Sequence, residues 1–151
     1  MTSYFYQIRF MKSNYIPLST CVGDPQWFHQ GTYNKSIQFK DKNGVWNGLR
    51  AEPFVPGEEC NGLCGGAPCP RSPGECLFLN TYKHQLNQLN FDEVIQRFEN
   101  IANTIQQLEG FTEEPVCVLI FHEKYDNPCS ERWPVVEWFK EHHYPIQEFN
   151  L

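Results

Sequence analysis

The six residues VCVLIF, at positions 116–121, constrain the fold of this chain most strongly. The run has no polar interruption and is rich in β-branched side chains, which is typical of a strand buried on both faces of a parallel sheet. Helical patterns precede it at residues 91–109 and follow it at residues 132–142. A helix, a buried strand and a second helix in succession predict the α/β class, with a mostly parallel sheet flanked by helices.

Local signals mark the ends of both predicted helices. Asn90 is an expected N-cap with Glu93 three residues later, and Gly110 can adopt the left-handed conformation that ends a helix. Pro134 is tolerated only in a first helical turn, so the last helix is expected to begin near Arg132.

Further strands are expected near both ends of the chain. Residues 3–10 alternate between apolar and polar, and residues 15–21 form a second extended candidate that Pro17 weakens or places at a sheet edge. An Asn-Gly pair at 43–44 predicts a hairpin, and residues 144–149 can supply a closing strand.

Length and composition predict one domain spanning residues 1–151. Hydrophobic residues make up 40% of the chain and aromatic residues 15%, which is typical of a folded domain rather than a disordered one. The formal net charge is −6, and no basic face is visible for binding duplex nucleic acid. The chain shows neither a long apolar span nor a signal-peptide pattern, so we expect a cytoplasmic protein that does not enter the membrane.

The loop after the 116–121 strand carries the candidate catalytic residues. Ligands of α/β sheets bind beyond the carboxyl ends of the strands, where helix N-termini point. Cys129 lies there just before a helix, and Arg132 and Lys124 are close in sequence, which favours the reactive thiolate. His122 and Glu123 follow the strand directly and are candidate general acids or bases.

A purely structural interpretation of the same loop stays open. Ser130 can cap the helix, Glu131 can interact with the helix dipole, and Cys129 can be a small buried side chain. His122 can be a solvated loop residue. A phosphatase loop of the C-x5-R type is absent, because Arg132 follows Cys129 after two residues.

Three stretches together resemble the family numbered 488 among the domains of unknown function. They are SYF…IRFM…NYIPLSTCVGDPQWF, CLFLNTYKHQLNQLNFDEVI and VCVLIFHEKYDNPCSERWPVVEWF, and the last is the most specific. The signature positions carried over are Glu123, Lys124, Cys129, Arg132 and Trp138, and Pro25, Trp27, Phe28 and Tyr82 are matched less closely.

This resemblance implies a Rossmann-like α/β sandwich and a site in the last motif. Many members have Cys-His-Arg where this chain has Cys-Ser-Glu-Arg at residues 129–132, so the family histidine is missing. The family has no established activity, and a relation to nucleotide-processing or N-glycosidic-bond enzymes is an analogy of fold.

A cysteine-rich loop is inserted at about residues 57–76. Cys60, Cys64, Cys69 and Cys76 have the spacing C-x3-C-x4-C-x6-C, and four thiolates suit a tetrahedral structural zinc. An iron–sulfur cluster is a second metal candidate. Free thiols, or disulfides in an oxidised sample, are the alternative without a metal.

The residues predict an enzyme that acts on a nucleotide- or nucleoside-like small molecule. Lys124, Arg132 and the helix start could hold a phosphate, and Trp27, Phe28 and Tyr82 could stack against a base. Two other classes remain open: a protein that captures such a ligand without turnover, and a partner-binding module that uses the metal loop. The oligomeric state is left open.

Overall fold

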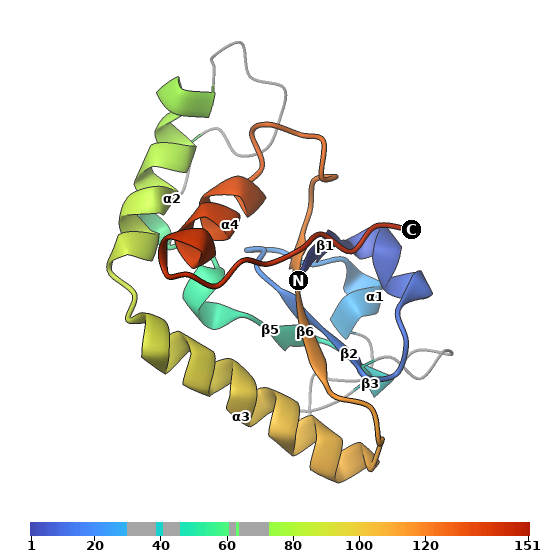
Figure 1. The fold of residues 1–151 in the computed structure, drawn as a ribbon. Helices are drawn as coiled ribbons and strands as arrows, with labels where there is room; N and C mark the ends of the chain where they lie inside the picture. Colours follow the sequence, from blue (N-terminus) through green and yellow to red (C-terminus); the bar gives the residue numbers. More distant parts are fainter. Residues whose placement is uncertain (30–38, 41–45, 61–62, 64–72) are drawn as a thin grey trace.

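The computed structural model describes residues 1–29, 39–40, 46–60, 63 and 73–151. Its centre is a four-stranded parallel sheet in the order β1–β6–β2–β5, flanked by helices (Figure 1). The four strands are β1 (Thr2–Tyr4), β2 (Tyr15–Ser19), β5 (Leu49–Arg50) and β6 (Val116–Phe121). The predicted α/β class with a parallel sheet is therefore confirmed.

The other elements are short helical segments, a small hairpin and three longer helices. The α-helices are α1 (Gln26–His29), α2 (Leu77–Asn87), α3 (Phe91–Glu109) and α4 (Arg132–Glu141). The 3-10 helices are η1 (Phe5–Phe10), η2 (Glu52–Phe54), η3 (Glu58–Cys60) and η4 (Pro73–Glu75), and the hairpin strands are β3 (Phe39–Lys40) and β4 (Trp46–Asn47).

The signals predicted at the ends of α3 are confirmed. The Asn90 side chain accepts a hydrogen bond from the Glu93 N–H at 3.1 Å, and Gly110 ends the helix with φ +67°. The helix starts and stops where its sequence provides partners for its end groups.

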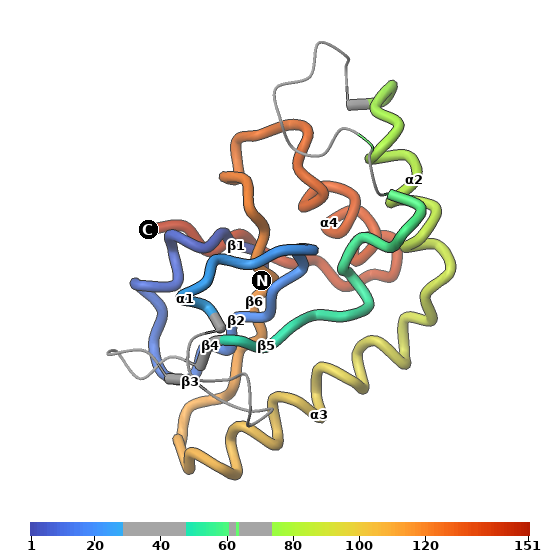
Figure 2. The backbone as a smooth tube through the Cα atoms, turned by 180° about the vertical axis from the view of Figure 1, so that it is seen from behind, coloured from blue at the N-terminus to red at the C-terminus, as the bar shows by residue number. Residues whose placement is uncertain are grey.

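Strand β6 is covered on both faces, as its apolar sequence predicts. Leu119 and Phe121 face the side of α2, α3 and α4, whereas Val118 and Ile120 face η1 and α1 (Figures 1 and 2). Alternate residues of a strand point to opposite faces, so two separate apolar clusters form, one on each side of the sheet.

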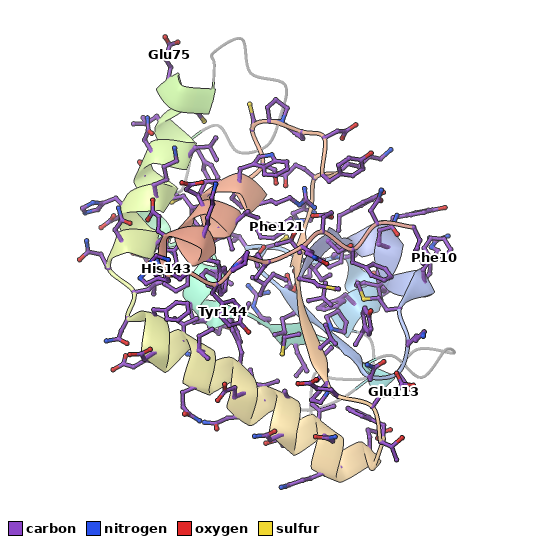
Figure 3. All side chains as sticks on the ribbon, in the orientation of Figure 1. Phe10, Glu75, Glu113, Phe121, His143 and Tyr144 are labelled. Atoms are coloured by element: carbon purple, nitrogen blue, oxygen red, sulfur yellow. The ribbon has the colours of Figure 1, made fainter. Side chains whose placement is uncertain are left out.

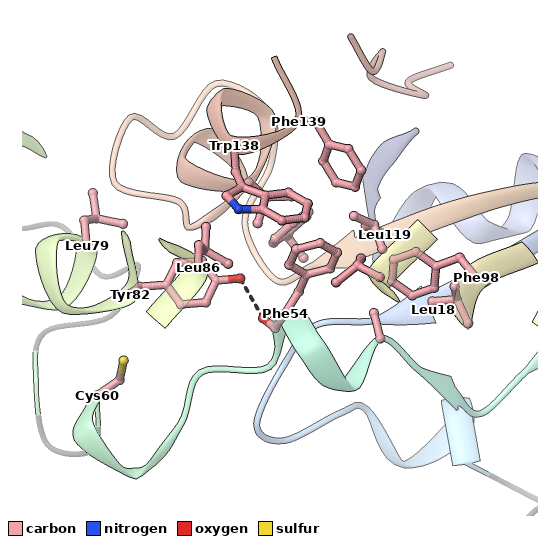
Figure 4. Close-up of a cluster of buried hydrophobic side chains, with 14 of the residues drawn as sticks. Leu18, Phe54, Cys60, Leu79, Tyr82, Leu86, Phe98, Leu119, Trp138 and Phe139 are labelled. Carbon is pink, nitrogen blue, oxygen red and sulfur yellow. Dashed lines mark hydrogen bonds between the residues drawn. The ribbon is translucent and has the colours of Figure 1, made fainter. Parts of the chain in front are cut away.

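The larger cluster is centred on Phe54. Its ring lies 5.5 Å from that of Trp138 and 5.8 Å from that of Phe98, and its carbonyl accepts a 2.6 Å hydrogen bond from the Tyr82 hydroxyl (Figure 4). One aromatic residue of η2 therefore contacts all three of the helices α2, α3 and α4.

The strand predicted for residues 3–10 is wrong beyond Tyr4. Strand β1 pairs with the last residues of β6, since Tyr4 lies opposite Phe121, and residues 5–10 form the 3-10 helix η1 instead. Strand β6 ends at Phe121, so the residues after Tyr4 have no part of β6 to pair with. The alternating sequence alone therefore does not produce a strand there. Phe10 consequently lies at the periphery, while Phe121 is in the interior (Figure 3).

The expectation that Pro17 weakens its strand or places it at an edge is also wrong. Strand β2 lies between β6 and β5, and it pairs with β6 over all five of its residues. The Ser19 carbonyl accepts from Ala51 N on the β5 side, and Pro17 has the same orientation two residues earlier. The backbone of Pro17 therefore faces β5, so its missing N–H removes no bond between β2 and β6. Strand β5 pairs only with Leu18 and Ser19 and does not extend to Pro17.

The predicted hairpin is present, since β3 and β4 pair antiparallel, although its Asn-Gly turn lies outside the described residues. Residues 144–149 supply a single parallel bridge rather than a strand. Glu148 pairs with Thr2, with Thr2 N donating to Gln147 O and Phe149 N donating to Thr2 O. Within the described residues, every helix is too short or too polar to span a bilayer.

Candidate functional site

The loop of residues 122–131 joins β6 to α4 at the carboxyl end of the parallel sheet (Figure 1). The ends of β1, β2 and β5 lie at the same edge, because all four strands run in parallel. This is the edge at which the sequence places the catalytic and phosphate-binding candidates.

Two glutamates of this loop interact. Glu131 is 6% exposed, and burial together with the neighbouring Glu123 carboxylate raises its pKa to about 7. Glu123 is half-buried, and its Oε2 lies 3.3 Å from the donating hydroxyl of Ser130. Ser130 also accepts from Arg132 N, the first N–H of α4, at 3.2 Å, although the N-cap residue of the helix is Glu131. The pair can hold a proton near neutral pH.

The guanidinium of Arg132 is turned into the protein. The side chain is fully buried, with Nη2 donating to Ser3 O at 3.0 Å and Nε 2.8 Å from Glu148 Oε1. It also lies over the Phe121 ring at 5.3 Å, and burial lowers its pKa. Its Nη1 has no hydrogen-bond partner among the described residues. Arg132 therefore joins α4 to β1 and to the C-terminal segment.

Cys129 is buried at 9% exposure, and its N–H donates to Asn127 Oδ1 at 2.9 Å. Cys129 and Arg132 are close in the sequence, but neither of them lines either of the two described pockets. Both side chains are buried, which agrees better with structural roles than with a thiol and a guanidinium that face one open cavity.

His122 and Trp27 meet on the ring of Phe5. The ring centroids of His122 and Trp27 lie 5.4 Å and 6.1 Å from that of Phe5. Both side chains are exposed, and His122 Nε2 lies 2.7 Å from Gly23 O. Lys124 is exposed in the same loop. Trp27 of α1 and His122 and Lys124 of the β6–α4 loop are thus exposed near the carboxyl end of the sheet, and we call these three residues the rim. Glu123 lies between His122 and Lys124 in the same loop.

Two predicted ligand-binding aromatics lie in the interior instead. Phe28 is fully buried against Phe5, with ring centroids 5.4 Å apart. Tyr82 is fully buried, and its hydroxyl already donates to Phe54 O. Phe28 and Tyr82 belong to the two apolar clusters on opposite faces of the sheet, and neither presents a free face to a base.

Two of the four predicted metal ligands are described. Cys60 at the end of η3 and Cys76 before α2 are both buried, and burial raises the pKa of Cys60. Cys64 and Cys69 lie outside the described residues. Within the described part of the chain, no group of three or more metal-binding side chains comes together.

Sequence reasoning missed a polar network at the ends of β2 and β5. The Ser19 hydroxyl bonds to Asp24, whose carboxylate is fully buried and lies 2.8 Å from Arg50 Nη1. Arg50 Nη2 donates to Cys21 O at 2.6 Å. The signal for this network in the sequence is the cluster of polar residues just after each strand. Glu131 was interpreted only as a helix-dipole partner.

The described pockets lie away from the predicted site. One of about 750 Å³ lies between α3 and the amino-terminal half of β6, and one of about 160 Å³ lies between α2 and α4. Neither is lined by a residue predicted to be catalytic, ligand-binding or metal-binding.

The family resemblance stays a prediction, since no family model matches the chain, and neither a curated protein nor a solved structure matches it.

Proposed function

We propose that this protein is an enzyme acting on a nucleotide- or nucleoside-like small molecule at the junction of β6 and α4. The observation that supports the proposal most is the pair of Glu131 and Glu123 at the carboxyl end of the sheet. Burial and the second carboxylate raise the pKa of Glu131 to about 7, which is the range that suits proton transfer at neutral pH.

The two carboxylates have different roles in this proposal. Glu123 is half-buried and can meet a substrate, whereas Glu131 is almost fully buried and holds the proton that the pair shares. In N-glycosidic cleavage, the bond between the sugar carbon and the base nitrogen breaks and the pair supplies the proton to that nitrogen. Water supplies the oxygen that forms the new bond to carbon, and Glu123 acts as base or as nucleophile.

The rim supplies the proposed binding contacts. Trp27 stacks against the base, with His122 beside it, and Lys124 pairs with a phosphate. Cys129 and Arg132 are positioning residues, because their side chains are buried: Arg132 fixes the start of α4, and Cys129 packs beneath the loop. Phe28 and Tyr82 are fully buried, one in each apolar cluster, and have structural roles. In this proposal the chain forms a single Rossmann-like domain.

The test is incubation with a panel of nucleosides and nucleotides, including NAD and cyclic nucleotides, followed by product analysis and thermal shift. We expect a product whose formation falls at least about a hundredfold in Glu123→Gln, as is usual when a general acid or base is lost. Glu137→Gln, an exposed carboxylate on α4, is the matched control and should be unchanged. Activity that survives Glu123→Gln would contradict the proposed role of the pair.

Capture of the same ligand without turnover is the second candidate function. The burial of both Cys129 and Arg132 favours it, because these side chains offer no open nucleophile or phosphate clamp. Thermal shifts without products would support capture. Neither shifts nor products with any nucleotide would favour the partner-binding module.

A structural zinc held by Cys60, Cys64, Cys69 and Cys76 remains part of the proposal. The donor chemistry fits, since cysteine thiolates are ordinary zinc ligands and Cys60 and Cys76 are buried at the two ends of the cysteine-rich segment. Elemental analysis of freshly purified protein should give about one zinc per chain. Zinc and iron both far below one equivalent would remove the metal, and a visible absorption band would favour the iron–sulfur alternative.

A further inference from the structure

The pocket of about 750 Å³ is a groove on the helical face of the sheet, at its amino end. We call it the α3 groove. Its floor is formed by Cys117 and Leu119 of β6 and by Phe98 and Ala102 of α3. Tyr144 lines the groove on the side of α4, and Figure 3 shows this residue between α3 and α4.

The α3 groove exists because α3 and α4 diverge over the sheet. Helix α3 runs obliquely away from α4, as both views show (Figures 1 and 2). Near the start of α3 the gap is filled by aromatic rings, with Phe91 5.5 Å from Trp138 and 6.0 Å from Tyr144. Further along, Ala102 presents only a methyl group, and the space stays open. Ligand pockets commonly have volumes of about 300–1,000 Å³, so a small molecule fits.

The charged side chains of the α3 groove are all acidic. Glu99 and Glu114 line it and are exposed, as is the uncharged Asn103, whereas Gln106 is half-buried. Among the residues that the structure describes, no lysine, arginine or histidine side chain lines the groove. The last turn of α3 also has no basic residue to offset the negative end of the helix dipole. The amino group of Met1 donates to Cys117 O, and burial lowers its pKa.

We propose that the α3 groove binds a small molecule with an apolar body and a positive charge, of the arylalkylammonium class. The apolar body lies on Phe98, Ala102 and Leu119, and the ammonium group lies near Glu99 and Glu114. The formal charge of −6 for the whole chain adds a favourable long-range attraction for a cation. This site is separate from the glutamate pair, which lies at the opposite end of the same sheet.

The test compares three probes that share one phenylbutyl body: 4-phenylbutylamine, 4-phenylbutanol and 5-phenylpentanoate. Binding is followed by amide NMR shifts of the ¹⁵N-labelled protein. We expect the amine to shift the amides of Ala102 and Cys117 but not that of Glu131, and to bind roughly tenfold more tightly than the carboxylate, as two exposed charges would produce. Equal affinities for the three probes, or no shift in the groove with millimolar amine, would overturn the proposal.

Two sets of variants separate charge from shape. Glu99→Gln with Glu114→Gln should weaken the amine about threefold to tenfold and leave the alcohol unchanged. Glu113→Gln, an exposed neighbour outside the groove lining, is the matched control. Ala102→Trp should fill the groove and abolish binding of both probes. If circular dichroism shows that Ala102→Trp is unfolded, the double glutamine variant decides alone, and unchanged amine binding in it would refute the site.

Discussion

At the carboxyl end of the sheet, charged side chains are buried and closely packed, whereas at the amino end a groove of about 750 Å³ lies open with its charged side chains exposed. Arg132, Glu131 and Asp24 are all removed from water at the first end. The second end is formed by small or apolar side chains, such as Ala102 and Cys117.

The two ends of the sheet therefore differ in what they offer: buried ionisable groups at one end and an open groove at the other. Burial of ionisable groups is unfavourable unless they are paired, so their concentration at one edge calls for either a structural or a catalytic reason. An open apolar groove is also unfavourable, because its lining loses packing contacts. We therefore infer proton chemistry at the carboxyl end and ligand binding at the amino end, and the following predictions test the two separately.

The largest effect is expected from Arg132→Ala at the carboxyl end. Removal of this fully buried side chain leaves the Glu148 carboxylate and the Ser3 carbonyl without their partner. We expect a loss of about 3 kcal/mol in the free energy of unfolding, as is typical when one member of a buried pair is removed. Denaturant titration measures it.

Arg97→Ala is the control for this substitution, because Arg97 is exposed on α3. It should change the free energy of unfolding by no more than about 0.5 kcal/mol. Similar losses in both variants would mean that the buried arginine makes no special contribution.

The second effect is a pH-dependent gain in stability from Glu131→Gln. The folded-state pKa of Glu131 is raised from 4.5 to about 7, so folding favours the protonated carboxyl. The native protein is thus not penalised below pH 4.5 and loses stability as the pH rises from there to about 7. The shift corresponds to at most about 3 kcal/mol at pH 8.

Glutamine carries no charge, so the advantage of Glu131→Gln over the unsubstituted protein should be present at pH 8 and disappear towards pH 4. Unfolding curves at both pH values measure it, with Glu137→Gln as the exposed control. A constant difference at all pH values would show that Glu131 does not titrate as its burial implies.

The smallest effect is expected at the amino end, from Gly110→Ala. Gly110 ends α3 with φ +67°, and an added Cβ would meet nothing within 4 Å, so the cost is backbone strain alone. We expect a loss of about 1 kcal/mol. Gly74→Ala has equally free space without a positive φ and should be close to neutral. Equal stabilities of the two variants would exclude strain at Gly110.

Sequence patterns predicted the elements whose signals are local. The bounds of β6 and of α3 follow from an uninterrupted apolar run and from Asn90 and Gly110, and the structure agrees with both. The predicted strand at residues 3–10 failed because strand length depends on the partner: β6 ends at Phe121, opposite Tyr4. Pro17 was misjudged for the same reason, since the length of β5 decides whether its missing N–H matters.

The sheet edge that carries the candidate site was predictable from the sequence, but the interactions of its side chains were not. The rule that ligands bind at the carboxyl ends of parallel strands located the edge, and Glu123 follows directly from β6. The partnership of Arg132 with Glu148 joins distant parts of the chain, and no local pattern reveals it. The raised pKa of Glu131 depends on burial by segments from elsewhere in the sequence, so it too became visible only in the fold.

The most direct test of proton chemistry at the carboxyl end is an NMR titration of the ¹³C-labelled side-chain carboxyl of Glu131. We expect its midpoint near pH 7, and a lower midpoint in Glu123→Gln, because that variant removes the neighbouring negative charge. A midpoint near the ordinary value of 4.5, unchanged by Glu123→Gln, would contradict the account.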